Sequence, residues 1–173
     1  MKFKAIALPL ALALFVPFLA QGKTIKFPKD NPEFTVTFPN DWKAEAGEGG
    51  IISAQPKGAG YALSIFPVTS SNAHDAIQET LKEVQKRFTN LKPNDQVEFK
   101  NENKVTFLEQ VFTGKDKGSD RSLAIVAFSP NGKSFFALFQ AGTPEADKQY
   151  TQATIAIVKS IKSLKSSSDD DDD

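Results

Sequence analysis

Few side chains in this 173-residue sequence could perform covalent or metal chemistry. His74 is the only histidine and there is no cysteine, which excludes histidine pairs, thiolate zinc sites, iron–sulfur clusters and cysteine nucleophiles. A Ser-His-Asp triad would have to use His74, and the serine-hydrolase pattern G-x-S-x-G is absent. We interpret His74 as an exposed residue in the first turn of a helix. The sequence therefore predicts no catalytic residue, no metal site and no cofactor.

Acidic side chains leave two alternatives open. Glycoside hydrolysis needs only two suitably spaced carboxyl groups, and Glu98 and Glu109 could approach each other across neighbouring strands. Lys100 and Lys104 lie close by in the sequence, so we favour solvated charges on a sheet face. Five consecutive aspartates, Asp169–Asp173, could bind cations weakly, although they lack the glycine and distal glutamate of a calcium loop. A small carboxylate-based hydrolase and a cation-binding tail are therefore the alternative functions.

The charge and glycine patterns argue against nucleic acids and nucleotides. Lys and Arg together number 21, as do Asp and Glu, so the formal net charge is zero and there is no basic excess. Gly58 and Gly60 begin like a dinucleotide-binding loop, but Leu63 stands in place of the last glycine. We expect neither a nucleic-acid partner nor a phosphate-binding loop.

The two ends of the sequence differ from its middle. Two lysines precede an uncharged apolar run, Ala5–Ala20, which is typical of a secretory signal peptide. We expect residues 1–22 to be this leader, 23–165 to form one domain, and 166–173 to be a disordered Ser/Asp tail. The protein is then expected to be periplasmic or secreted, without stable membrane insertion after the leader is removed.

The elements that must position these side chains follow from the apolar pattern. Phe34, Val36 and Phe38 alternate with threonines, which predicts a half-buried strand. Apolar segments at 51–54 and 61–66 flank a turn rich in glycine and proline, which predicts a hairpin. Four more strands joined by short hydrophilic turns predict an antiparallel meander, with the third at its centre. These four strands are expected at Val97–Lys100, Val105–Thr113, Ser122–Phe128 and Ser134–Gln140.

Two amphipathic segments predict helices. Asn72 can cap the first, whose apolar stripe runs on to Leu91 before Pro93 ends it. Thr143 can cap the second, with Pro144 at its first position. An antiparallel sheet packed with two helices predicts an α+β sandwich.

Two strings in this pattern resemble the PsbP-like fold, which is named for an extrinsic subunit of the photosynthetic oxygen-evolving complex. They are residues 34–42, FTVTFPNDW, and residues 131–142, NGKSFFALFQAG. The resemblance implies an α/β/α sandwich from about Glu33 to Leu164, related to bacterial secreted and DcrB-like periplasmic proteins. Many of those are lipoproteins, whereas this sequence has no cysteine to carry a lipid.

The resemblance also implies a noncatalytic function. We therefore expect a protein-interaction or stabilising module whose partner is another envelope or secreted protein. Partner contacts are expected in two polar, glycine-containing segments, Ala44–Gly50 and Gly114–Asp120, because such segments are usually exposed loops.

Overall fold

The computed structural model describes residues 22–47, 49–58 and 60–164. Its helices are α1 (Ala73–Val84) and α2 (Pro144–Ser160). The strands are β1 (Gly22–Phe27), β2 (Phe34–Pro39), β3 (Trp42–Gly47), β4 (Ile51–Pro56), β5 (Tyr61–Pro67), β6 (Thr89–Lys100), β7 (Thr106–Asp116), β8 (Ser119–Ser129), β9 (Phe136–Gly142) and β10 (Lys162–Ser163).

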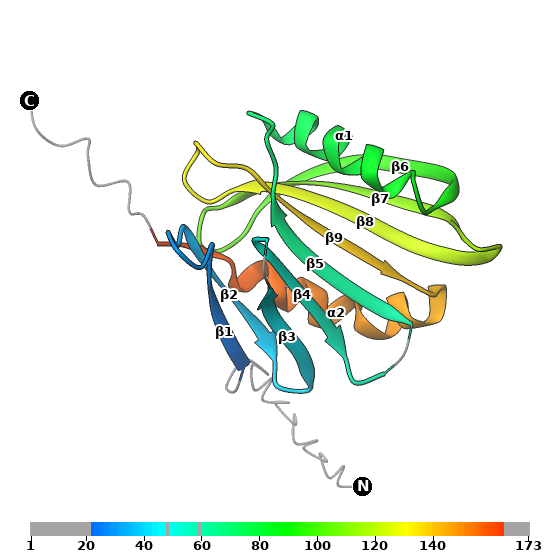
Figure 1. Ribbon diagram of the computed structural model, residues 1–173, viewed down its shortest axis with the longest axis horizontal. Coiled ribbons are helices and arrows are strands. Elements are labelled where there is room, and N and C mark those ends of the chain that lie inside the picture. Colours follow the sequence, from blue (N-terminus) through cyan, green and yellow to red (C-terminus); the bar gives the residue numbers. More distant parts are fainter. Residues whose placement is uncertain (1–21, 48, 59, 165–173) are drawn as a thin grey trace, which may run out of the picture.

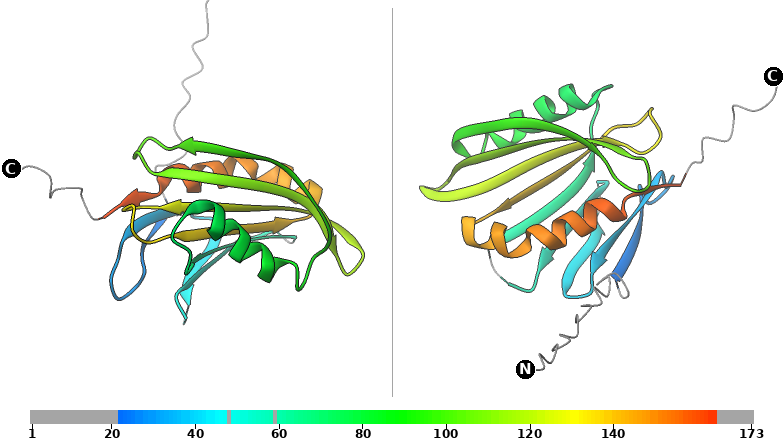
Figure 2. Two further views of the ribbon diagram at one scale, coloured as in Figure 1. Left: turned by 90° about the horizontal axis from the view of Figure 1, so that it is seen from above. Right: turned by 180° about the vertical axis from the view of Figure 1, so that it is seen from behind.

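These strands form two antiparallel sheets. The larger sheet has seven strands in the order β3-β4-β5-β9-β8-β7-β6, and the smaller has the order β1-β2-β10. The two helices lie on opposite faces of the larger sheet, and the smaller sheet lies beside α2 (Figures 1 and 2). The expected α+β sandwich and its antiparallel meander are therefore confirmed. The middle position belongs to β9, and β8, expected to be central, is its neighbour.

The side chains of β8 alternate between two separate hydrophobic cores. Ile125 and Ala127 pack with α1 on one face, whereas Val126 and Phe128 pack with α2 and the smaller sheet on the other. Successive side chains of a strand point to opposite faces, so a strand between two helices must be apolar throughout. The apolar run in the sequence of β8 is therefore continuous because both faces of the strand are covered.

The helix starts agree with the sequence, but one helix end does not. The Asn72 side chain accepts a hydrogen bond from the Asp75 backbone nitrogen at 2.9 Å. The prediction that α1 continues toward Pro93 is wrong, because α1 ends at Val84 and Leu91 and Pro93 belong to β6. This segment pairs with β7, with register shifts on either side of Lys92 and Pro93, and an edge strand tolerates a proline.

The two segments expected to be contact loops are mostly strand. Trp42–Gly47 is β3, which pairs with β4 along its whole length. Gly114 and its neighbours belong to β7, and the connection to β8 is a tight turn at Lys117 and Gly118, whose φ angles are 51° and 85°. A side chain at Gly114 would lie 2.6 Å from Leu91 Cδ2, so close packing, not loop flexibility, explains this glycine.

The ends of the chain complete the description. Residues 1–21 of the expected leader and the expected tail, 166–173, lie outside the described residues. Gly22, which we expected to be the last leader residue, begins β1 and pairs with Pro39. Within the described ranges, no helix combines the length and the apolar character that crossing a membrane requires.

Candidate functional site

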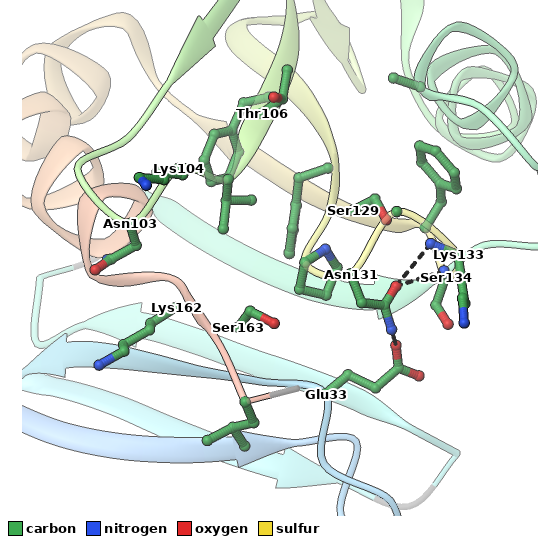
Figure 3. Close-up of a pocket in the computed structure, with 18 of the residues that line it drawn as sticks. Glu33, Asn103, Lys104, Thr106, Ser129, Asn131, Lys133, Ser134, Lys162 and Ser163 are labelled. Atoms are coloured by element: carbon green, nitrogen blue, oxygen red, sulfur yellow. Dashed lines mark hydrogen bonds between the residues drawn. The ribbon is translucent and has the colours of Figure 1, made fainter. Parts of the chain in front are cut away.

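A groove of about 1420 Å³ opens at one end of the sandwich (Figure 3). We call it the end groove. Its walls come from the β1–β2 connection, the β6–β7 turn, the β8–β9 loop and the segment that follows α2. It is lined by Asn31, Glu33, Ala73, Glu98, 103–108, 128–135 and 162–164.

Asn101 fixes one wall of the end groove. Its Nδ2 donates hydrogen bonds to the carbonyl oxygens of Val158 (3.2 Å) and Ile161 (2.8 Å), at the end of α2. Its Oδ1 accepts from the backbone nitrogens of Asn103 (3.0 Å) and Val105 (3.1 Å). The last carbonyls of a helix have no partner inside the helix. The Asn101 amide therefore shapes the β6–β7 turn and caps α2 together with Asn103, whose Nδ2 donates to the carbonyl oxygens of Lys159 and Ile161.

Asn131 fixes the opposite wall. Its Oδ1 accepts hydrogen bonds from the backbone nitrogens of Lys133 (2.9 Å) and Ser134 (3.0 Å), which closes the β8–β9 loop on itself. Its Nδ2 donates to Glu33 Oε2 at 2.6 Å, which ties the loop to the β1–β2 connection (Figure 3). Both walls of the end groove are thus held by side-chain amides.

The end groove carries more positive than negative side chains. Lys104, Lys133 and Lys162 line it together with Glu33 and Glu98. None of these three lysines forms an ion pair with any residue that the structure describes. Lys104 has a φ of 63°, a left-handed conformation that the Asn101 contacts on either side of it hold in place.

Hydroxyl groups also line the end groove. Nucleophilic catalysis needs an activating base within hydrogen-bond reach of the nucleophile. Serine and threonine hydroxyls line the groove, and the Ser129 Oγ is buried without a hydrogen-bond partner among the described residues. His74 is exposed on α1, as expected, and it is not among the residues that line the groove.

The structure separates the two carboxylates considered for hydrolysis. In the β6–β7 pairing, Glu98 is opposite Leu108 and Glu109 is opposite Val97. Residues directly opposite share a face and adjacent residues do not, so the two glutamates point to opposite faces of the sheet. The expectation that they could approach each other is wrong. Glu98 lines the end groove, whereas Glu109 is on the α2 face.

Glu109 has a different acidic neighbour, Asp147 of α2, which the sequence analysis missed. Burial, followed by the negative charge of Asp147, raises the pKa of Glu109, and burial also raises the pKa of Asp147. Tyr61 lies in the same region and hydrogen-bonds to Thr154 Oγ1 at 2.8 Å. Burial raises the pKa of Tyr61 to about 12, so its hydroxyl keeps its proton at neutral pH. Only the packing of α2 on the sheet brings these groups together.

Replacing Glu109 with glutamine is expected to stabilise the protein at pH 7. The folded-state pKa of Glu109 lies above its unfolded value, so above the folded pKa the carboxylate favours unfolding. We expect a gain of about 0.5 kcal/mol, since the group is partly solvated. The gain should disappear as pH falls through the folded pKa toward the unfolded value of about 4.3. Thermal unfolding between pH 4 and 8 measures this.

The matched control is Glu98→Gln, which removes the same charge from the opposite face. A Glu109→Gln protein that is less stable than wild type at pH 7 would contradict the prediction. So would a gain that is equally large in Glu98→Gln.

Comparison with known proteins rests on structure alone, because no protein-family model and no curated protein matches the chain. PsbP (CyanoP) from Synechocystis sp. PCC 6803 matches with a TM-score of 0.59 at 12% sequence identity, over 83% of this chain and 93% of CyanoP. The chain has the PsbP-like fold.

Two other solved structures match at similar levels. LpqN, described as involved in cell envelope biogenesis of Mycobacterium tuberculosis, has a TM-score of 0.53 and 14% identity, over 82% of this chain and 91% of LpqN. The Ran-binding protein Mog1p of Saccharomyces cerevisiae has a TM-score of 0.54 and 7% identity, over 82% of this chain and 94% of Mog1p. At these identities the likeness establishes the PsbP-like fold and no shared site.

The sequence contained one usable signal for the end groove. In an antiparallel meander, alternate connections lie at the same end of the sheet. The β6–β7 and β8–β9 connections were both predicted as asparagine-containing turns, so their meeting at one end of the PsbP-like fold follows from the meander. Nothing in the sequence indicated that Glu33, just before β2, and Lys162, in β10, would line the same groove.

Proposed function

We propose that this protein is a noncatalytic protein-binding or stabilising module that acts outside the cytoplasm, and that the end groove is its binding surface. The observation that carries the proposal is an open groove with walls held by Asn101 and Asn131 and with three lysines that pair with no described residue. Fixed walls lower the entropy cost of binding. Lysines at an interface attract and orient an oppositely charged partner.

Two features support a location outside the cytoplasm. The first is the leader that the sequence predicts for residues 1–22. The second is the fold shared with LpqN, which is described as involved in cell envelope biogenesis. Together they make another envelope or secreted protein the proposed partner.

Site-specific photo-crosslinking in the native envelope tests this proposal. A photoreactive amino acid placed at Lys104 or Lys133 is expected to give a discrete adduct with a second protein. The matched control position is Lys43, an exposed lysine of β3 that does not line the end groove. If position 43 gave as much adduct as the groove positions, the end groove would not be the binding surface. Turnover of glycoside or ester substrates that is lost in Glu109→Gln would overturn the noncatalytic assignment.

A further inference from the structure

The end groove has a small positive excess, because three lysines line it together with two glutamates. Lys104 comes from the β6–β7 turn, Lys133 from the β8–β9 loop and Lys162 from β10, so three separate segments bring lysines to one groove. No described carboxylate pairs with any of them. Because the asparagine hydrogen bonds hold the segments bearing Lys104 and Lys133, these positions are set before a ligand arrives.

We propose that the end groove binds an extended acidic peptide segment of a partner protein, an inference that rests on the proposed function. Carboxylates of the segment pair with Lys104, Lys133 and Lys162. The groove also exposes an apolar contact, since Leu164 at its edge is 42% exposed. A segment that carries apolar residues between its carboxylates fits this lining best, because apolar area at the contact adds affinity that charge alone does not supply.

The lining favours a peptide over a nucleic acid or a polyphosphate. Nucleic-acid sites collect lysines and arginines into a continuous basic stripe. Here the lysines are spread among hydroxyls and amides, and Glu33 and Glu98 share the same groove. These two carboxylates would repel a dense row of phosphates, whereas a peptide can place its carboxylates singly.

A fluorescence anisotropy titration tests the assignment with a labelled synthetic peptide of alternating aspartate and leucine. We expect the full chain to bind it at low salt and to lose affinity as salt rises. The triple variant Lys104→Gln/Lys133→Gln/Lys162→Gln should bind about tenfold more weakly or worse, which corresponds to about 1.4 kcal/mol. Circular dichroism checks that each variant is folded.

The matched control is Lys43→Gln/Lys57→Gln/Lys148→Gln, which removes the same charge from exposed lysines that do not line the groove. Unchanged binding by this control supports the assignment. Equal weakening by both triple variants would overturn it, as would equal binding of a peptide with asparagine in place of aspartate. Inorganic polyphosphate or an oligonucleotide that binds more tightly than the peptide would overturn the assignment and indicate a phosphate-containing ligand.

Two further outcomes separate this inference from others. The chain's own Asp169–Asp173 follow Leu164 closely in the sequence and carry the same charge, so the titration is repeated with a chain that ends at Leu164. If only the shortened chain bound the peptide, the chain's own Asp169–Asp173 would be the ligand of the groove. The proposal of an acidic partner would then be overturned. Photo-crosslinks to an envelope protein without any peptide binding would leave the proposed function standing and refute the acidic partner.

Discussion

Replacing Phe34 with alanine is expected to lower the free energy of unfolding by about 4 kcal/mol, the cost of deleting a fully buried aromatic ring. Phe34 is 0% exposed. Its ring centroid lies 5.6 Å from that of Phe27, 5.3 Å from Phe128 and 5.0 Å from Phe136, in edge-to-face contacts. Because Phe34 belongs to β2 and two of these partners belong to β8 and β9, this ring packs the small sheet on the large one, as Phe27 does through Phe136.

Urea unfolding followed by tryptophan fluorescence measures this effect, since Trp42 is the only tryptophan and is buried. The control is Phe34→Leu, which keeps most of the volume and should cost about 1.5 kcal/mol or less. A loss below about 1 kcal/mol in Phe34→Ala would contradict the prediction that this ring packs tightly between the two sheets. The prediction that Phe34 lies on the buried side of a half-buried strand would then be wrong.

Asn101→Ala is expected to be the second most damaging of these changes, with a loss of about 2–3 kcal/mol. It removes one donor to the Val158 and Ile161 carbonyls and the acceptor of the Asn103 and Val105 nitrogens. The two carbonyls keep a second donor each, from the Ile161 nitrogen and from Asn103 Nδ2, so the two nitrogens account for most of the loss. Buried polar groups without partners cost more than the bond itself is worth. The end of α2 and the β6–β7 turn should therefore loosen together.

Hydrogen exchange of the α2 C-terminal amides, combined with urea unfolding, measures this change. Asn101→Asp keeps the acceptor but places a negative charge beside the carbonyl end of the helix, which the helix dipole disfavours. We expect it to be no more stable than Asn101→Ala. Asn103→Ala, which removes bonds to Lys159 and Ile161 only, should cost less. If Asn103→Ala proved the more damaging, Asn101 would not be the residue that holds this wall.

Asn101 also connects stability to the proposed binding. The turn that it shapes carries Lys104, and the helix that it caps leads into Lys162 and Leu164. Both segments of the wall that Asn101 fixes thus depend on this side chain. Acidic-peptide affinity is therefore expected to fall in Asn101→Ala even though none of the groove lysines has been replaced.

The predictions that succeeded depend on neighbours in the sequence. Asn72 and Thr143 accept hydrogen bonds from backbone nitrogens three residues later, so the helix starts are local events. The alternation in β2 and the apolar run in β8 reflect which faces are covered, and that pattern is also visible locally.

The elements that were missed or misassigned from the sequence depend on pairing with a partner strand. β1 has few apolar residues and exists because it pairs with β2 along its length. β3 is small and partly charged, and its pairing with β4 makes it a strand. Phe88 and Leu91 continue a helical spacing, yet the segment from Thr89 pairs with β7 instead. In each case hydrogen bonds to the next strand of the chain outweigh weak local preferences.

The candidate site shows the same division. The sequence by itself determined which chemistry was possible: one histidine, no cysteine, and lysines, asparagines and carboxylates in polar turns. Only the tertiary structure decided which of these groups meet. Strand register put Glu98 and Glu109 on opposite faces, helix packing brought Asp147 to Glu109, and three connections brought Lys104, Lys133 and Lys162 to one groove. Residue type sets what a group can bind, but its neighbours are set by pairing and packing between segments that are distant in the chain.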